Sequence, residues 1–146
     1  MKNAWPSWRP GEIASVDSNI LIYASAQDAG EKTPIARQLL RDLGLRSGMV
    51  SVQTLGEFFV TAVRKYKVSS ADALNAIVLW QNAFTIIGSQ SSVLVHAINI
   101  VDRYDLQFWD AMLLSAVKEA GANVLFSEDL QGGQIIDGVR IINPFV

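Results

Sequence analysis

Residues 48–66 read GMVSVQTLGEFFVTAVRKY, a short apolar run followed directly by a segment with helical spacing. The run GMVSV (48–52) is typical of a buried strand. From about Thr54 to Tyr66, apolar side chains recur at the spacing of one helix face, which consists of Leu55, Phe58, Phe59, Ala62, Val63 and Tyr66. A strand followed by a helix is the repeating unit of α/β folds.

The same alternation extends over most of the chain. We expect further strands at 13–16, 84–88 and 123–127, and a fifth at the edge of the sheet at 139–143. Helices are expected over about 18–26, 33–46, 69–83, 92–104 and 108–121, with Thr33 as N-cap and Pro34 as first residue of the second one. No linker divides the chain. We therefore predict a loose N-terminal extension (1–12) and a single α/β domain (13–146), with a mostly parallel sheet of four or five strands.

Composition narrows the available chemistry. The 146 residues include no cysteine and one histidine, and the formal net charge is −2. Disulfides, thiolate zinc sites, cysteine nucleophiles and sites built from several histidines are therefore excluded. No apolar run approaches the ~18 residues of a membrane span, and the N-terminus lacks the apolar core of a signal peptide. We expect a cytoplasmic protein without membrane contact, whose chemistry depends on carboxylates and hydroxyl groups.

Four carboxylates fall where a parallel sheet places its ligands. Asp17 ends the first strand, Glu57 lies in the expected first turn of the helix after the second strand, and Asp129 follows the fourth strand by two residues. Asp110 lies in the first turn of the helix that leads into that fourth strand. Because such a helix runs antiparallel to the strand, it begins at the carboxyl edge of the sheet, where Asp17 and Asp129 also lie. Ligands of such sheets lie beyond the carboxyl ends of the strands. We therefore expect the four acids to converge on one rim.

Asp110 is the most informative of these acids. In the stretch LQFWDAMLL (106–114), helical spacing places Asp110 opposite a narrow polar arc of Ser115, Lys118 and Glu119. It falls within an apolar arc of Trp109, Met112, Leu113, Leu114, Ala116, Val117 and Ala120. An unpaired buried charge costs several kcal/mol. This acid therefore needs a cation, or a capping role if its helix begins later. The other three acids have ordinary alternatives as a helix cap, a solvated residue and a turn residue.

The chemistry of a carboxylate cluster points to a hard cation. Clustered carboxylates repel one another unless a cation compensates. Without histidine or cysteine ligands, an all-oxygen site suits Mg²⁺ or Mn²⁺. Such ions keep several waters and meet substrate phosphates, and they can activate a water and stabilise a leaving oxygen. Position and ligand type thus predict metal-dependent phosphodiester hydrolysis.

The chain resembles the PIN-domain ribonucleases, especially the VapC toxins of VapBC toxin–antitoxin modules. The matching blocks, in order along the chain, are VDSNILIYA (16–24), SVQTLGEFF (51–59), LQFWDAMLLSAVKEAG (106–121), VLFSEDLQGG (124–133) and RIINPF (140–145). The resemblance implies a three-layer α/β/α fold and a Mg²⁺- or Mn²⁺-dependent endoribonuclease. It also implies an RNA substrate, a cognate antitoxin partner and a homodimer.

The resemblance assigns a role to each acid. Asp17 and Asp110 would be the principal ligands of a first metal ion. Glu57 would complete that site or act as base on the attacking water, and Asp129 would serve a second metal ion or the substrate. Glu128, its neighbour, stays open as an alternative to Asp129.

Further residues would support the site. Ser127 matches a position that is Thr or Ser in the family and would bond to a carboxylate or phosphate. Asn19, two residues after the first acid, would have a hydrogen-bonding role. Three basic residues near the end of the helix that carries Glu57 could steer a phosphate backbone, or be a solvated helix end: Arg64, Lys65 and Lys67.

Two other functions remain open from the sequence. One is a catalytically silent PIN-fold protein that binds RNA or a partner, which the four intact acids disfavour. The other is phosphoryl transfer with Asp17 as nucleophile. That chemistry usually needs a second Asp two residues further on, where this chain has Asn19, and a lysine at a later strand end, where it has none.

Overall fold

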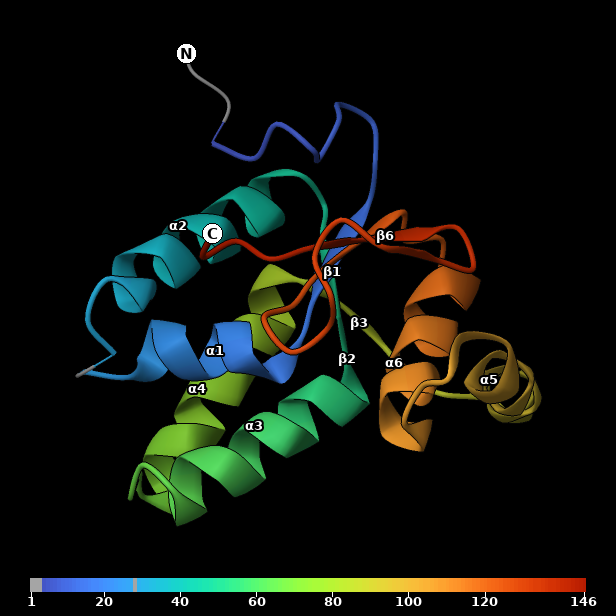
Figure 1. Ribbon diagram of the computed structural model, residues 1–146. Helices are drawn as coiled ribbons and strands as arrows, with labels where there is room; N and C mark the ends of the chain where they lie inside the picture. Colours follow the sequence, from blue (N-terminus) through green and yellow to red (C-terminus); the bar gives the residue numbers. More distant parts are fainter. Residues whose placement is uncertain (1–3, 28) are drawn as a thin grey trace.

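A mostly parallel sheet with helices on both faces forms the protein in the computed structural model, which describes residues 4–27 and 29–146 (Figure 1). The strands are β1 (Ala14–Val16), β2 (Met49–Ser51), β3 (Thr85–Ile87), β4 (Val124–Phe126), β5 (Ile135–Ile136) and β6 (Val139–Ile142). The helices are α1 (Ser18–Ser25), α2 (Lys32–Leu45), α3 (Val52–Arg64), α4 (Ser70–Ala83), α5 (Ser91–Tyr104) and α6 (Phe108–Glu119).

The six strands are arranged in the order β3-β2-β1-β4-β6-β5. All neighbours are parallel except β5 and β6, which form an antiparallel pair. The prediction of four or five strands missed β5, because two residues carry no alternation of apolar and polar side chains. The prediction that 139–143 forms the edge was also wrong, since β5 covers β6 on its outer side. Val16 pairs with Phe126, so the residues that follow β1 and β4 lie side by side.

The helices form two layers, each with its own apolar core. One face of the sheet packs against α1 to α4, with Leu21, Leu39 and Phe58 among the fully buried side chains. The other face packs against α5 and α6 (Figure 1). The predicted three-layer α/β/α fold with a mostly parallel sheet is confirmed. Among the described residues, no helix combines the length and apolar character needed to span a bilayer.

Residues 4–12 pack against the domain, so the prediction of a loose extension was wrong for this segment. Trp8 is fully buried and Trp5 is 9% exposed. Both rings make edge-to-face contacts with Phe126 of β4, at centroid distances of 5.6 and 5.7 Å. The Arg46 guanidinium lies 3.5 Å from the centre of the Trp8 ring. An aromatic–cation stack of this kind fixes the segment against the end of α2.

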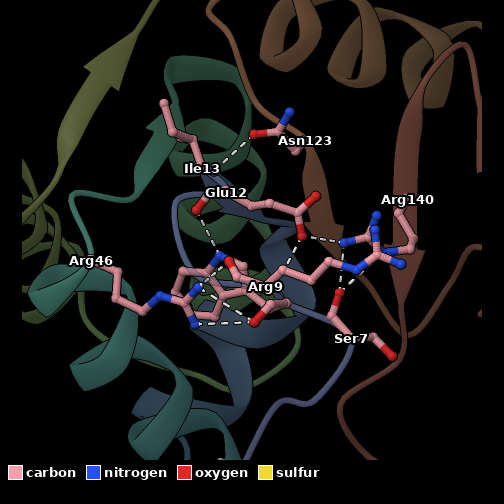
Figure 2. Close-up of polar contacts among 8 residues, drawn as sticks. Ser7, Arg9, Glu12, Ile13, Arg46, Asn123 and Arg140 are labelled. Carbon is pink, nitrogen blue, oxygen red and sulfur yellow. Dashed lines mark hydrogen bonds and ion pairs between the residues drawn. The ribbon is translucent and has the colours of Figure 1, made fainter.

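Polar contacts hold the same segment on its other side (Figure 2). Arg140 of β6 forms an ion pair with Glu12 and donates to the Ser7 carbonyl from Nε at 3.0 Å. Arg46 Nη2 donates to the Arg9 carbonyl at 2.6 Å. The segment therefore connects α2 with β6 across the end of the sheet remote from the acids.

Two helix starts differ from the predictions. Helix α2 begins at Lys32, and the Thr33 hydroxyl donates to the carbonyl of Tyr23 at 2.8 Å instead of capping the helix. Helix α3 begins at Val52, because Ser51 accepts a hydrogen bond from the Thr54 amide and acts as N-cap. Glu57 consequently lies in the second turn of α3, not the first.

Candidate active site

Asp17 lies at the junction of β1 and α1 and is 4% exposed. Its Oδ1 accepts from the Ser18 amide at 2.7 Å, and its Oδ2 accepts from the Ser127 hydroxyl at 2.9 Å. Burial raises the pKa of Asp17 to about 6, against the lowering effect of these two hydrogen bonds. The nearby carboxylates of Glu57 and Asp129 raise the pKa further. A carboxylate in this position holds its charge at a cost, which a cation would relieve.

Glu57 faces the same edge from α3. Its Oε1 accepts from Gln53 Nε2 at 2.9 Å, and its Oε2 accepts from the Ser18 hydroxyl at 3.3 Å. Gln53 Nε2 also donates to the Trp109 carbonyl at 3.0 Å, which ties α3 to the start of α6. Sequence reasoning missed Gln53 and Ser18. The spacing of four residues between Gln53 and Glu57 on one helix could have indicated the first of these contacts.

Asp110 lies in the first turn of α6 and is partly buried. Burial raises its pKa, and the carboxylates of Asp129 and Glu57 raise it further. The predicted buried arc was partly wrong, because Trp109 is 62% exposed while Ser115 is buried and donates to the Val93 carbonyl at 2.9 Å. Helix α6 packs against the sheet on one side and against α5 on the other, so the residues from 113 to 117 are all buried.

The structure distinguishes Asp129 from Glu128. Asp129 is exposed, and its Oδ2 accepts from Asn19 Nδ2 at 3.1 Å. Glu128 points to another group, in which it accepts from the Tyr23 hydroxyl at 2.5 Å and forms an ion pair with Lys32. Burial tends to raise the pKa of Glu128, but the hydrogen bonds from Lys32 and Tyr23 leave it below the ordinary value. Glu128 is thus already neutralised, whereas Asp129 interacts with the other acids.

Ser127 connects the parts of this rim. It is fully buried, and besides donating to Asp17 its oxygen accepts from the amides of Asp129 and Leu130 at 3.2 and 3.4 Å. One hydroxyl therefore fixes Asp17 and the backbone of the turn that carries Asp129. A bond from Ser127 to a carboxylate is what the family resemblance implies, and its role in catalysis stays a prediction.

The donor set fits a hydrated divalent cation. Within the described residues, none of the acids Asp17, Glu57, Asp110 and Asp129 forms an ion pair. Burial, and after it the neighbouring carboxylates, raise the pKa of both Asp17 and Asp110. No three described acidic or histidine side chains are gathered as a ready-made metal cage. Mg²⁺ commonly binds through one or two carboxylates and keeps several waters, which this rim allows.

The basic residues predicted to contact RNA lie at the end of α3 and are exposed: Arg64, Lys65 and Lys67. The structure separates them. Lys65 lines a small cavity that also includes Asp129, whereas Lys67 lines a larger cavity between α3 and α4. Only the first cavity adjoins the acids.

Comparison with known proteins assigns the chain to a family. The sequence model of the PIN domain matches residues 14–131. The chain belongs to the PIN domain family. The resemblance predicted from the sequence is confirmed, and residues 4–12 precede the matched region of this PIN domain. No curated protein matches the chain by sequence.

Solved structures share the fold of the PIN domain at low sequence identity. A toxin–antitoxin complex from Klebsiella pneumoniae is 22% identical, with a TM-score of 0.67, 90% of this chain covered and 97% of that chain. VapC20 from Mycobacterium tuberculosis, a toxin that cleaves the sarcin–ricin loop, is 17% identical, with a TM-score of 0.65, 80% of this chain covered and 91% of that chain. DNA-bound VapBC from Salmonella typhimurium is 18% identical, with a TM-score of 0.65 and coverages of 89% and 96%. The fold is thus that of VapC-type toxins.

Proposed function

We propose that this PIN domain is a metal-dependent endoribonuclease, the toxin component of a toxin–antitoxin module. The observation that carries the proposal is the convergence of Asp17, Glu57, Asp110 and Asp129 on one edge of the sheet without a cationic partner among the described residues. A binding scaffold gains nothing from this arrangement, because the repulsion between the acids opposes folding. The family membership adds independent support.

Each acid has a proposed role that follows its surroundings. Asp17 and Asp110 would hold a first Mg²⁺ or Mn²⁺, since burial and neighbouring carboxylates disfavour the charge of both and a cation would stabilise it. Glu57, oriented by Gln53 and Ser18, would complete that site or accept the proton of the attacking water. Asp129, the most exposed of the four, would face a second ion or the substrate phosphate. When bound, the cation would supply a more acidic water and would offset the negative charge that develops on the phosphate.

The supporting residues keep this arrangement in place. Ser127 orients Asp17, and Asn19 orients Asp129 through its amide. The reaction would be water attack on an RNA phosphodiester without a covalent enzyme intermediate. A cognate antitoxin, a homodimer and a cytoplasmic location belong to the same proposal. The toxin–antitoxin complexes among the structural neighbours support the antitoxin partner.

The test is cleavage of total RNA by the purified protein with Mg²⁺, with Mn²⁺ or with EDTA. We expect cleavage only with metal, and a loss of at least ~100-fold in rate for Asp17→Asn and Asp110→Asn. Asp102→Asn is the matched control, because Asp102 is exposed on α5 and lies outside the site. Cleavage that survives EDTA, or that both site variants retain, would contradict the mechanism.

The same experiment separates the alternatives. A silent PIN-fold protein would bind RNA or a partner and cleave nothing under any metal condition. Phosphoryl transfer through Asp17 would leave a covalent adduct that mass spectrometry detects in the wild type and not in Asp17→Asn. The second aspartate that this chemistry usually needs is replaced by Asn19, whose amide donates a hydrogen bond to Asp129.

A further inference from the structure

A small cavity adjoins the acidic rim between α1 and the end of α3. Its volume is about 210 Å³, and it opens beside Asp129. Besides Ser18 and the apolar Ile22, its lining side chains combine aromatic rings, hydroxyl groups, an amide, a carboxylate and an ammonium group: Asn19, Tyr23, Thr61, Lys65, Tyr66 and Asp129. None of the roles proposed for the acids uses Tyr23, Thr61 or Tyr66.

One wall of the cavity is rigid. The Tyr23 hydroxyl donates to Glu128 at 2.5 Å, and its ring makes an edge-to-face contact with Phe145 at a centroid distance of 5.3 Å. The Lys32 ammonium lies 4.8 Å from the centre of the same ring. Tyr23 is therefore held from three sides and presents a fixed aromatic surface.

The opposite wall has free polar groups. Within the described chain, the side chains of Thr61, Lys65 and Tyr66 form no hydrogen bond or ion pair. Tyr66 is 39% exposed, and the Lys65 ammonium lies 5.6 Å from the centre of its ring. An occupant would therefore meet an aromatic face, two hydroxyl groups and one cation. Within the described residues, these hydroxyl groups and this cation have no hydrogen bond or ion pair to give up.

This combination matches a nucleotide better than a simple anion or an apolar ligand. Unpaired RNA bases stack on aromatic side chains and are read through hydrogen bonds to their edges. A nearby ammonium group binds the attached phosphate. Asn19 both lines the cavity and donates to Asp129, so an occupant of the cavity lies next to the acidic rim.

We infer that this cavity binds the base of a nucleotide adjacent to the scissile phosphate. The inference rests on the proposed ribonuclease function and makes it more specific. Tyr66 stacks on the base, the Thr61 hydroxyl contacts its edge and Lys65 contacts its phosphate. Because a base must leave its stack to enter, the enzyme selects single-stranded or looped RNA, and it discriminates between bases at one position next to the cut.

The first experiment maps cleavage sites in a randomised single-stranded RNA pool with Mn²⁺. We expect the wild type to favour one base at a fixed position beside the cut. Tyr66→Leu and Thr61→Val should each flatten that preference, and Tyr66→Leu should lower kcat/KM by ~10-fold or more through the loss of stacking. Val60→Ala is the matched control, since Val60 is the exposed neighbour of Thr61 on α3 and does not line the cavity. Thermal melts of each variant exclude unfolding as the cause.

The second experiment measures binding without catalysis. In EDTA, a short RNA that carries 2-aminopurine is titrated into the Asp17→Asn protein, and stacking on Tyr66 should quench the fluorescence. The Tyr66→Leu change in that background should abolish the quenching, and a duplex probe should show none. A preference that both cavity variants retain, or equal cleavage of duplex and single strand, overturns the inference and leaves the nuclease proposal standing. A wild-type protein that cleaves no RNA overturns the proposed function. In that case the quenching experiment still tests the base site, which is overturned if Tyr66→Leu quenches as strongly as the protein with Tyr66.

Discussion

Replacing Asp17 with asparagine should stabilise the metal-free protein. The carboxyl group is 4% exposed, and its pKa is raised from 3.8 to about 6. At 1.36 kcal/mol per pKa unit, the ionised side chain costs the folded state ~3 kcal/mol at pH 7.5. An amide removes this cost but bonds less well to Ser127, which offsets ~1 kcal/mol. We therefore expect Asp17→Asn to gain ~2 kcal/mol, or about 4–8 °C in Tm for a domain of this size.

The gain should depend on pH with a definite sign. Because the folded pKa of Asp17 is raised, its contribution to stability is fully present below pH 3.8 and is lost as the pH rises through about 6. The free energy that Asp17→Asn gains by removing the charge should therefore be about half as large at pH 5 as at pH 7.5. The assay is thermal unfolding in EDTA at pH 5 and pH 7.5 for the wild type, Asp17→Asn and the exposed control Asp102→Asn. Added Mn²⁺ should then raise the Tm of the wild type and not that of Asp17→Asn.

Two results would refute this reasoning. One is an Asp17→Asn protein that is less stable than the wild type in EDTA at pH 7.5. The other is a difference in Tm that is the same at both pH values, since it would mean that the Asp17 charge is not the cause. The control should change by less than ~0.5 kcal/mol at either pH.

Three further predictions concern packing and the choice of acid. Trp8→Ala should lower the free energy of unfolding by ~3–5 kcal/mol in urea, because the fully buried ring leaves a cavity; an unchanged midpoint would show that the segment is dispensable. Gly48→Ala should destabilise the protein by more than ~1 kcal/mol in the same urea titration, since a Cβ would lie 2.3 Å from the Leu43 side chain. Gly56→Ala should stabilise it by up to ~1 kcal/mol, because Gly56 lies within α3 and a Cβ there would have nothing within 4 Å. Asp129→Asn should abolish RNA cleavage while Glu128→Gln keeps most of it, and the reverse order would exchange their roles.

The order of strands and helices was largely predictable, because short apolar runs alternate with amphipathic segments. The convergence of the acids followed from one rule, that parallel strands place their following residues at a common edge. Ser127 and Asn19 form hydrogen bonds to Asp17 and Asp129, and their roles in catalysis stay predictions.

What escaped prediction depended on contacts distant in sequence. The burial of Trp8 depends on contacts with Phe126 and Arg46, and the sequence pattern of residues 1–12 does not indicate such distant partners. The burial of Ser115 escaped because helical spacing assumes one buried face, while α6 packs against both the sheet and α5. Thr33 was predicted as a cap from its residue type, but its hydroxyl has a better acceptor in the Tyr23 carbonyl.

The strand order also determines when the four acids can first meet during synthesis of the chain. The central strand β1 is made early, but its neighbour β4 and the turn with Asp129 come more than a hundred residues later. Asp17 meets Ser127 only after β4 has left the ribosome and paired with β1. A nascent chain therefore has no complete rim of acids close to ribosomal RNA. Translation would thus delay the proposed nuclease activity until β4 and the turn that carries Asp129 are available to the fold.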